Sequence, residues 1–236
     1  MAEPLVLLPE FMCDARLFLP QLLALGRDRP VTVAPLSGGE RIEEIASHLL
    51  PQLPQRFALA GLGLGGMVAM EILRRAPDRV GRLALMDTEP LAETPAQAAE
   101  RDPLIVRARS GALDAAVAEV IRPDHLAPGP GRFEIMAALT AMARDLGPEV
   151  FVRQIRALQR RRDQQATLRR CKVPTLLLCG AADTLTPVKR HAFLAELIPG
   201  AELRVIERAG HLPTLEAPEE TTDALSDWLD APYVLR

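Results

Sequence analysis

The strongest constraint on the fold is an alternation of short apolar runs with amphipathic stretches along this chain of 236 residues. Strands that are apolar along their whole length are typical of a parallel sheet that helices cover on both faces. The alternation therefore predicts an α/β fold with one mostly parallel sheet of about six strands. The expected strands are residues 4–8, 31–36, 57–60, 82–86, 173–179 and 202–206, and the expected helices are 17–25, 42–50, 67–75, 187–198 and 218–229.

The alternation stops at about residue 90 and resumes at about residue 173. The interval contains only helical patterns, which are broken by prolines and by Pro-Gly pairs. We therefore expect a core formed by 1–89 and 173–236, with a helical insertion, 90–172, after the fourth strand. Within the insertion, the basic run Gln159–Asp163 predicts a solvated helix face; the alternative is a funnel for anionic substrates.

The amino-acid composition of the chain narrows the kinds of molecule that it is expected to bind. A formal net charge of −3 and an aromatic content of 3% disfavour a protein that binds nucleic acid. No apolar run reaches the roughly 18 residues needed to cross a bilayer, and the first residues lack the basic segment of a signal peptide. The three cysteines form no metal-binding spacing. We expect a cytoplasmic protein with reduced thiols that acts on a small molecule.

Chemically distinctive residues follow the expected strands. Ligands of parallel α/β sheets bind beyond the carboxyl ends of the strands, so these residues are the candidates for a site. Three other histidines, His48, His125 and His191, are expected to lie at the surface or in packing positions. The candidates are Glu10, Phe11, Ser37, the glycine cluster Gly61–Gly66, Asp87, Asp183 and His211.

The glycine cluster has two interpretations. Gly61, Gly63 and Gly66 match the dinucleotide fingerprint, which also follows a strand and opens a helix, and Asp87 ends the next strand. Against this, two strand–helix units precede the cluster, and the interpretation leaves Asp183 and His211 without a role.

The alternative is a nucleophile elbow, Gly-x-Ser-x-Gly, in which Gly63 replaces the serine. The elbow turn is so tight that its neighbours, here Gly61 and Gly65, must be small. An elbow also predicts an acid and then a histidine on later loops, as Asp183 and His211 are placed here. Asp87 is a competing acid because it also ends a strand.

The order of these elements resembles that of the α/β-hydrolase superfamily over nearly the whole chain. The resemblance implies an α/β-hydrolase fold with a helical cap over residues 90–172. It implies a serine hydrolase of small esters, thioesters or related acyl substrates, without cofactor or metal. His211 would then be the general base, Asp183 would orient it, and the N–H groups of Phe11 and Leu64 would form the oxyanion hole. The matching segments are 57–71, 178–187 and 210–219, together with 7–14, which is similar to the oxyanion loop of small bacterial members.

Two residues depart from that pattern. The superfamily has serine at the position of Gly63 and commonly glycine at that of Glu10, and a glycine cannot attack a carbonyl. We therefore expect this chain to be inactive as a hydrolase. Gly63 has three open explanations. The glycine was introduced into a serine hydrolase, it belongs to a natural binding protein, or it belongs to a natural catalyst that uses His211 and Asp183 without a covalent step.

The remaining candidates are weaker. Glu10 and Ser37 are expected at the rim of the site, where Glu10 would orient a water, reject an anion or point to solvent. Cys13 is expected to be a buried thiol rather than a substitute nucleophile. A serine restored at position 63 is expected to regain hydrolysis, with Glu10 as the main obstacle.

Overall fold

The computed structural model describes residues 2–232, so Met1 and residues 233–236 of the expected core lie outside the described part. Six strands form one sheet in the order β2-β1-β3-β4-β5-β6, and every neighbouring pair is parallel. The predicted sheet is confirmed. The strands are β1 (Leu5–Leu8), β2 (Val31–Val33), β3 (Phe57–Leu62), β4 (Val80–Met86), β5 (Thr175–Gly180) and β6 (Glu202–Ile206).

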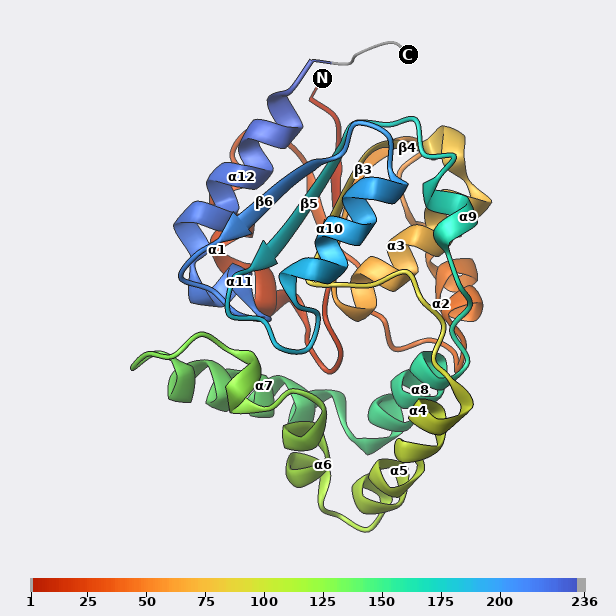
Figure 1. Cartoon of the computed structure of the whole chain (residues 1–236), viewed down its shortest axis with the longest axis vertical. Coiled ribbons are helices and arrows are strands. Elements are labelled where there is room, and N and C mark those ends of the chain that lie inside the picture. The colour runs from red at the N-terminus through yellow and green to blue at the C-terminus, as the bar shows by residue number, and fades with distance from the viewer. Residues whose placement is uncertain (1, 233–236) are drawn as a thin grey trace.

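The central strands are buried from end to end, whereas the edge strands β2 and β6 are partly exposed. This burial explains the continuous apolar runs of the sequence, because helices cover both faces of the sheet. α1 (Leu19–Leu25) packs against α12 (Pro218–Asp230), and α2 (Ile42–Leu49) packs against α3 (Leu64–Arg75). Figure 1 shows these two groups on opposite sides of the sheet, and α10 (Val188–Leu197) packs on β5 and β6.

The described residues between β4 and β5 form helices and turns only. They are α4 (Pro95–Glu100), α5 (Asp102–Arg109), α6 (Leu113–Val120), η4 (Pro123–His125), α7 (Arg132–Leu146), α8 (Pro148–Gln159) and α9 (Gln165–Leu168). Figure 1 shows α4 to α8 as a layer across the carboxyl ends of the strands. α9 instead packs on α3 and α10, so the end of this interval lies against the core. The layer faces the edge of the sheet where the candidate residues were expected.

The basic run departs from its prediction. α8 ends at Gln159, so Arg160, Arg161 and Arg162 follow the helix rather than forming one of its faces. Arg161 is buried, whereas the side chain of Arg160 is 38% exposed and that of Arg162 is 69% exposed. The structure also contains short elements that the sequence patterns did not predict: η1 (Ala15–Phe18), η2 (Leu50–Gln52), η3 (Pro77–Arg79) and α11 (Pro213–Glu216).

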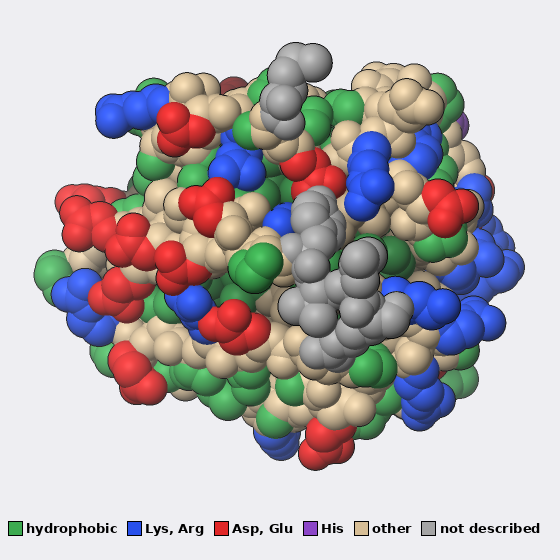
Figure 2. Space-filling view, turned by 90° about the horizontal axis from the view of Figure 1, so that it is seen from above, with side chains coloured by type: hydrophobic (Ala, Val, Ile, Leu, Met, Phe, Trp, Pro, Cys, Tyr) green, Lys and Arg blue, Asp and Glu red, His purple; other side chains and the backbone are tan. Residues whose placement is uncertain are grey.

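The face of the molecule shown in Figure 2 carries both acidic and basic side chains. Figure 2 shows acidic side chains gathered on one side of that face and basic side chains on the other. Among the residues that the structure describes, no helix is long and apolar enough to cross a membrane.

Candidate active site

Gly63 forms the turn between β3 and α3 in a backbone conformation that is strained for other residues. Its φ is +51° and its ψ is −111°, a region that favours glycine. The turn is tight, because a Cβ on Gly61 would lie 2.3 Å from the carbonyl oxygen of Gly65. This strand–turn–helix geometry is that of a nucleophile elbow.

His211 and Asp183 meet from the loops after β6 and β5. The distance from His211 Nδ1 to Asp183 Oδ2 is 2.9 Å, and both side chains are buried. Asp183 also accepts hydrogen bonds from the N–H groups of Leu185 (2.7 Å) and Thr186 (3.1 Å) and from the Thr186 hydroxyl (2.5 Å). Burial opposes the charge, but the cationic His211 and these donors hold the pKa of Asp183 well below its usual range.

Asp87, the competing acid, lies beneath this pair. Its Oδ1 accepts a hydrogen bond from the Gly180 N–H at 3.0 Å, and the acid that bonds His211 is Asp183. Burial and the nearby Asp183 carboxylate raise the pKa of Asp87 well above its usual range and so favour its neutral form. Asp87, Asp183 and His211 have potential metal-ligand atoms within 4.8 Å of one another. Because Asp183 and His211 are already bonded to each other, we assign no metal to this group.

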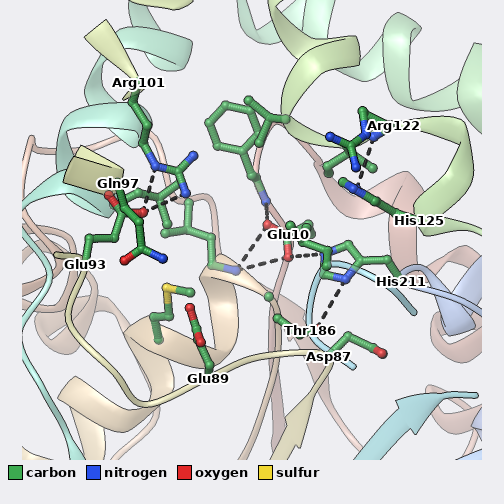
Figure 3. Close-up of a pocket in the computed structure, with 18 of the residues that line it drawn as sticks. Glu10, Asp87, Glu89, Glu93, Gln97, Arg101, Arg122, His125, Thr186 and His211 are labelled. Carbon is green, nitrogen blue, oxygen red and sulfur yellow. Dashed lines mark hydrogen bonds and ion pairs between the residues drawn. The ribbon is translucent and has the colours of Figure 1, made fainter. Parts of the chain in front are cut away.

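Glu10 lies at the centre of the site, which corrects its expected place at the rim. The residue is only 5% exposed, and both carboxylate oxygens accept hydrogen bonds. Oε1 accepts from the N–H groups of Phe11 and Leu64, and Oε2 accepts from Leu64 at 3.2 Å and lies 3.2 Å from His211 Nε2. Figure 3 shows Glu10 and His211 pointing toward each other. The carboxylate of Glu10 therefore occupies the expected oxyanion hole.

The same carboxylate also fills the space of the side chain that Gly63 lacks. A Cβ built on Gly63 would lie 0.9 Å from Glu10 Oε2 and 2.1 Å from Glu10 Cδ. Glu10 Oε2 thus stands beside the elbow and within hydrogen-bonding distance of the histidine, where a nucleophile would be placed. Any residue larger than glycine at position 63 must displace Glu10, so a serine there meets a direct steric conflict.

His211 is positively charged in this arrangement. Burial lowers the pKa of His211, but the carboxylates of Asp183 and Glu10 outweigh burial and raise it well above its usual range. Nδ1–H then donates to Asp183, and Nε2–H donates to Glu10. The two carboxylates thus favour the protonated form of His211, which lies between them.

Gln154 on α8, a residue that the sequence patterns did not single out, bonds the loop that carries Glu10 and Phe11. Its Oε1 accepts a hydrogen bond from the Met12 N–H at 2.8 Å, and its Nε2 donates to the Leu36 carbonyl at 3.1 Å. The Phe151 ring on the same helix packs edge-on against Phe11, with ring centroids 5.2 Å apart. A glutamine inside an amphipathic helix carries no sequence signal of such a long-range role.

His125 in the cap is also part of the site. Its backbone carbonyl oxygen accepts a hydrogen bond from the backbone N–H of His211 at 2.9 Å, and His125 is buried on the wall of the cavity. The expectation of a surface or packing role is therefore incomplete for His125. His191 does pack in the core, where burial lowers its pKa to about 4, and His48 is exposed.

A cavity of about 440 Å³ opens above Glu10, Gly63 and His211. Its wall combines apolar side chains with ion pairs that join Arg161 to Glu89 (2.8 Å) and Glu93 (2.6 Å). Ser37, expected at the rim, is not among the residues that line this cavity. Cys13 is not among them either, and burial, together with Glu10, raises the pKa of its thiol well above the usual range.

Comparisons with known proteins agree with this geometry. A sequence profile described as the alpha/beta hydrolase family matches residues 5–224. The chain belongs to this family. It is 30% identical over 208 residues to a pimeloyl-acyl-carrier-protein methyl ester esterase of Aromatoleum aromaticum, with 80% of each chain covered.

Solved structures of this family share the fold. An esterase of Thermogutta terrifontis superimposes with a TM-score of 0.85 at 27% identity, covering 97% of this chain and 90% of that one. An enol-lactonase of Burkholderia xenovorans gives a TM-score of 0.85 at 23% identity, covering 98% of this chain and 92% of that one. The predicted α/β-hydrolase fold is confirmed, and the relatives are hydrolases.

Proposed function

We propose that this family member acts on a small molecule without forming an acyl-enzyme at residue 63, and that Glu10, His211 and Asp183 are its reacting groups. The observation that carries this proposal is the position of Glu10 Oε2, 0.9 Å from where the Cβ of residue 63 would be and 3.2 Å from His211 Nε2. A serine esterase needs a hydroxyl, a neutral histidine and a free oxyanion hole. This site has no hydroxyl, because residue 63 is glycine. Glu10 fills the oxyanion hole, and its carboxylate favours a protonated His211.

Gly63 and Glu10 depend on each other. Only glycine at position 63 leaves room for the Glu10 carboxylate, and the carboxylate takes up the room that the glycine leaves. The hydrogen bonds from Phe11, Leu64 and His211 satisfy its buried charge. This complementarity favours a natural site over a serine hydrolase from which the nucleophile alone was deleted.

Two alternatives have distinct tests. A binding protein without turnover would bind a ligand in the cavity and leave it unchanged. A dinucleotide protein would place a pyrophosphate at the amino end of α3, where the negative Glu10 already accepts the Leu64 N–H. Titration with NADH is therefore expected to leave the cofactor fluorescence unchanged at millimolar concentration.

The test of the proposed function compares the chain with Gly63→Ser and with Gly63→Ser combined with Glu10→Gly. The unmodified chain is expected to neither react with a fluorophosphonate probe nor hydrolyse a short activated ester. Gly63→Ser alone is expected to remain unreactive, since the new side chain competes with Glu10 for the same space. The double variant frees the hole and the histidine, and is expected to label and to hydrolyse the ester.

Adding His211→Ala to the double variant is the control. It removes the base and is expected to abolish labelling and to lower ester hydrolysis by several orders of magnitude, roughly 10⁴-fold or more. Fluorophosphonate labelling of the unmodified chain, or ester hydrolysis at the rate of the double variant, would overturn the proposed function.

A further inference from the structure

We propose that His125 in the cap is a ligand-binding residue, and that its Nε2–H donates a hydrogen bond to the carbonyl oxygen of a small neutral molecule in the cavity. This inference rests on the proposed function, since it assigns a ligand class to the same site. His125 is only 3% exposed and lies on the cavity wall with Glu10 and His211. No sequence pattern assigned this role to the residue.

The hydrogen bond at Nδ1 determines which ring nitrogen of His125 carries the proton. The backbone N–H of Arg122 donates to Nδ1 at 3.2 Å, so Nδ1 is an acceptor. In a neutral imidazole one nitrogen accepts hydrogen bonds and the other carries the hydrogen. The proton of the neutral His125 ring is therefore on Nε2.

The surroundings of His125 favour this neutral ring. Burial lowers the pKa of His125, and the nearby charges of Arg122 and His211 lower it further. The carboxylates of Asp124 and Asp183 act in the opposite direction without reversing the shift. Because the ordinary pKa of a histidine is about 6.5, a lowered value leaves His125 mainly neutral at pH 7.

Nε2 is the ring atom that remains for a ligand. It has no hydrogen-bond partner among the described residues, and the protein does not enclose it as it encloses the unpartnered Nδ1 of His191. Because the rest of His125 is buried on the cavity wall, Nε2–H faces the cavity. Figure 3 shows the His125 ring beside the space above Glu10 and His211. An acceptor oxygen of a ligand would satisfy this donor.

The cap segment that carries His125 is fixed to the core. The backbone carbonyl of His125 accepts the backbone N–H of His211 at 2.9 Å. Two residues further on, the N–H of Ala127 donates to Glu216 Oε2 at 2.7 Å. The same oxygen accepts the Gly210 N–H at 2.9 Å, next to His211. The donor is therefore held in place before a ligand binds, which lowers the entropic cost of binding.

The occupied oxyanion hole explains why a ligand oxygen needs a donor from the cap. The N–H groups of Phe11 and Leu64, which would otherwise bind that oxygen, already hold the Glu10 carboxylate. A neutral imidazole N–H can bind and polarise a carbonyl oxygen. The negative charge of Glu10 disfavours an anionic ligand in the same space. A neutral carbonyl compound therefore fits both groups.

The arginines on the cavity wall do not reverse this preference, because carboxylates neutralise them. An anion would have to compete with these carboxylates for each guanidinium group. The pairs are Arg101 with Glu93, Arg122 with Asp124, Arg161 with Glu89 and Glu93, and Arg190 with Glu89.

The deciding experiment titrates the unmodified, nitrogen-15-labelled chain with matched probes and follows the histidine ring nitrogens by NMR. Cyclohexanone and acetophenone carry a carbonyl oxygen, whereas methylenecyclohexane and α-methylstyrene have nearly the same shape with a CH₂ group in its place. At about pH 8, above the ordinary histidine pKa, the free protein is expected to have the His125 proton on Nε2. The carbonyl probes, at millimolar concentration, are expected to shift the Nε2 signal saturably, and the hydrocarbon probes are expected to leave it unchanged.

Variants of His125 separate its donor from the rest of the ring. His125→Asn keeps an acceptor for the Arg122 N–H but lacks the distal donor, and is expected to weaken cyclohexanone binding roughly three- to tenfold, the effect of one hydrogen bond. His125→Gln, whose amide reaches about as far as Nε2, is expected to recover part of that loss. The matched control is His48→Asn, at an exposed site, which is expected to bind like the unmodified chain. Thermal melts check that each variant folds, and the NMR result on the unmodified chain does not depend on them.

Three results would overturn the inference: a proton on Nδ1 of neutral His125, the same response of Nε2 to carbonyl and hydrocarbon probes, including no response to either, or undiminished cyclohexanone binding in folded His125→Asn. Each of them leaves the proposed function standing. Fluorophosphonate labelling of the unmodified chain would instead overturn the proposed function, so the two failures are distinguishable.

Discussion

Among individual residues, Glu10 has the most demanding surroundings. A buried carboxylate is costly unless hydrogen bonds and an opposite charge compensate for the loss of water. Glu10 receives two backbone N–H groups and faces the cationic His211. Gly63 contributes by having no side chain, which leaves the volume that the carboxylate occupies. The position of the Glu10 carboxylate and the charge of His211 therefore depend on each other.

The coupling predicts how stability depends on pH. His211 has a raised pKa in the folded protein, against an ordinary value of about 6.5. Its contribution to the free energy of unfolding is fully present below about pH 6.5 and is lost as pH rises through the raised value. The melting temperature is expected to fall across that alkaline window. Asp183 acts in the opposite sense, because its pKa is lowered and its contribution is lost as pH falls below about 3.8.

The substitution Glu10→Gln distinguishes the effect of Glu10 on the pKa of His211 from that of Asp183. It removes one of the charges that raise the pKa of His211 and is expected to shift the alkaline loss of stability to lower pH. NMR titration of the His211 ring checks this directly, and His48→Gln, at an exposed site, is the control. The same alkaline midpoint in Glu10→Gln and in the unmodified chain would show that Glu10 does not interact with a charged His211.

At the scale of elements, α8 does more than cover the site. Gln154 bonds two loops of the core, through the Met12 N–H and the Leu36 carbonyl, and is itself buried. Met12 has a φ of +53°, which is unusual for a residue other than glycine, in the loop that also carries Glu10 and Phe11. α8 thus helps to hold the loop that carries Glu10 and Phe11 in its conformation.

Gln154→Ala is expected to lower the free energy of unfolding by about 1–3 kcal/mol, because it leaves a buried N–H and a buried carbonyl without their partner. Urea denaturation measures this change. The control is Gln52→Ala, since Gln52 is exposed and bonds only a nearby carbonyl. It is expected to change stability by less than about 0.5 kcal/mol. Equal stability of the two variants would contradict the role assigned to Gln154.

At the scale of the whole molecule, buried polar groups join the cap to the core. Arg161, near the end of the insertion, pairs with Glu89 and Glu93 near its beginning and donates to the Leu91 carbonyl. Gln164 donates to Glu71 on α3, where Arg74 and Arg75 also pair, and these donors outweigh burial and lower the pKa of Glu71 to about 2. The two ends of the insertion are therefore held together over the sheet.

Arg161→Ala is expected to destabilise the protein by about 3 kcal/mol, because it leaves buried carboxylates with fewer partners. The neighbouring Arg160→Ala is the control, since the exposed pair of Arg160 with Glu40 contributes no more than about 1 kcal/mol. Equilibrium unfolding measures both variants. If Glu93→Gln restores part of the stability lost in Arg161→Ala, the loss arises from unpaired charge; no recovery would point to lost packing instead.

The sequence alone determined the order of strands and helices, the helical interval after β4 and the loops that carry Glu10, Asp183 and His211. These features follow from local periodicity, because a strand buried on both faces must be apolar along its length. The elbow turn could also be predicted from the sequence, because Gly61 and Gly65 mark a turn that admits only small residues. The resemblance to the α/β-hydrolase superfamily implied Asp183 rather than Asp87 as the partner of His211, and their hydrogen bonds agree with it.

Only the tertiary structure decided where the Glu10 carboxylate lies. Its partners Leu64 and His211 lie 54 and 201 residues away along the chain, and no periodicity reports a contact of that range. The same applies to Gln154, which is 142 residues from Met12, and to Arg161, whose burial depends on how the two ends of the insertion meet. Local patterns record which face of an element is buried, whereas the direction of one polar side chain depends on volume and charge supplied by distant segments. For that reason the absence of a side chain at Gly63 predicted a lost nucleophile, and the fold shows a carboxylate in its place.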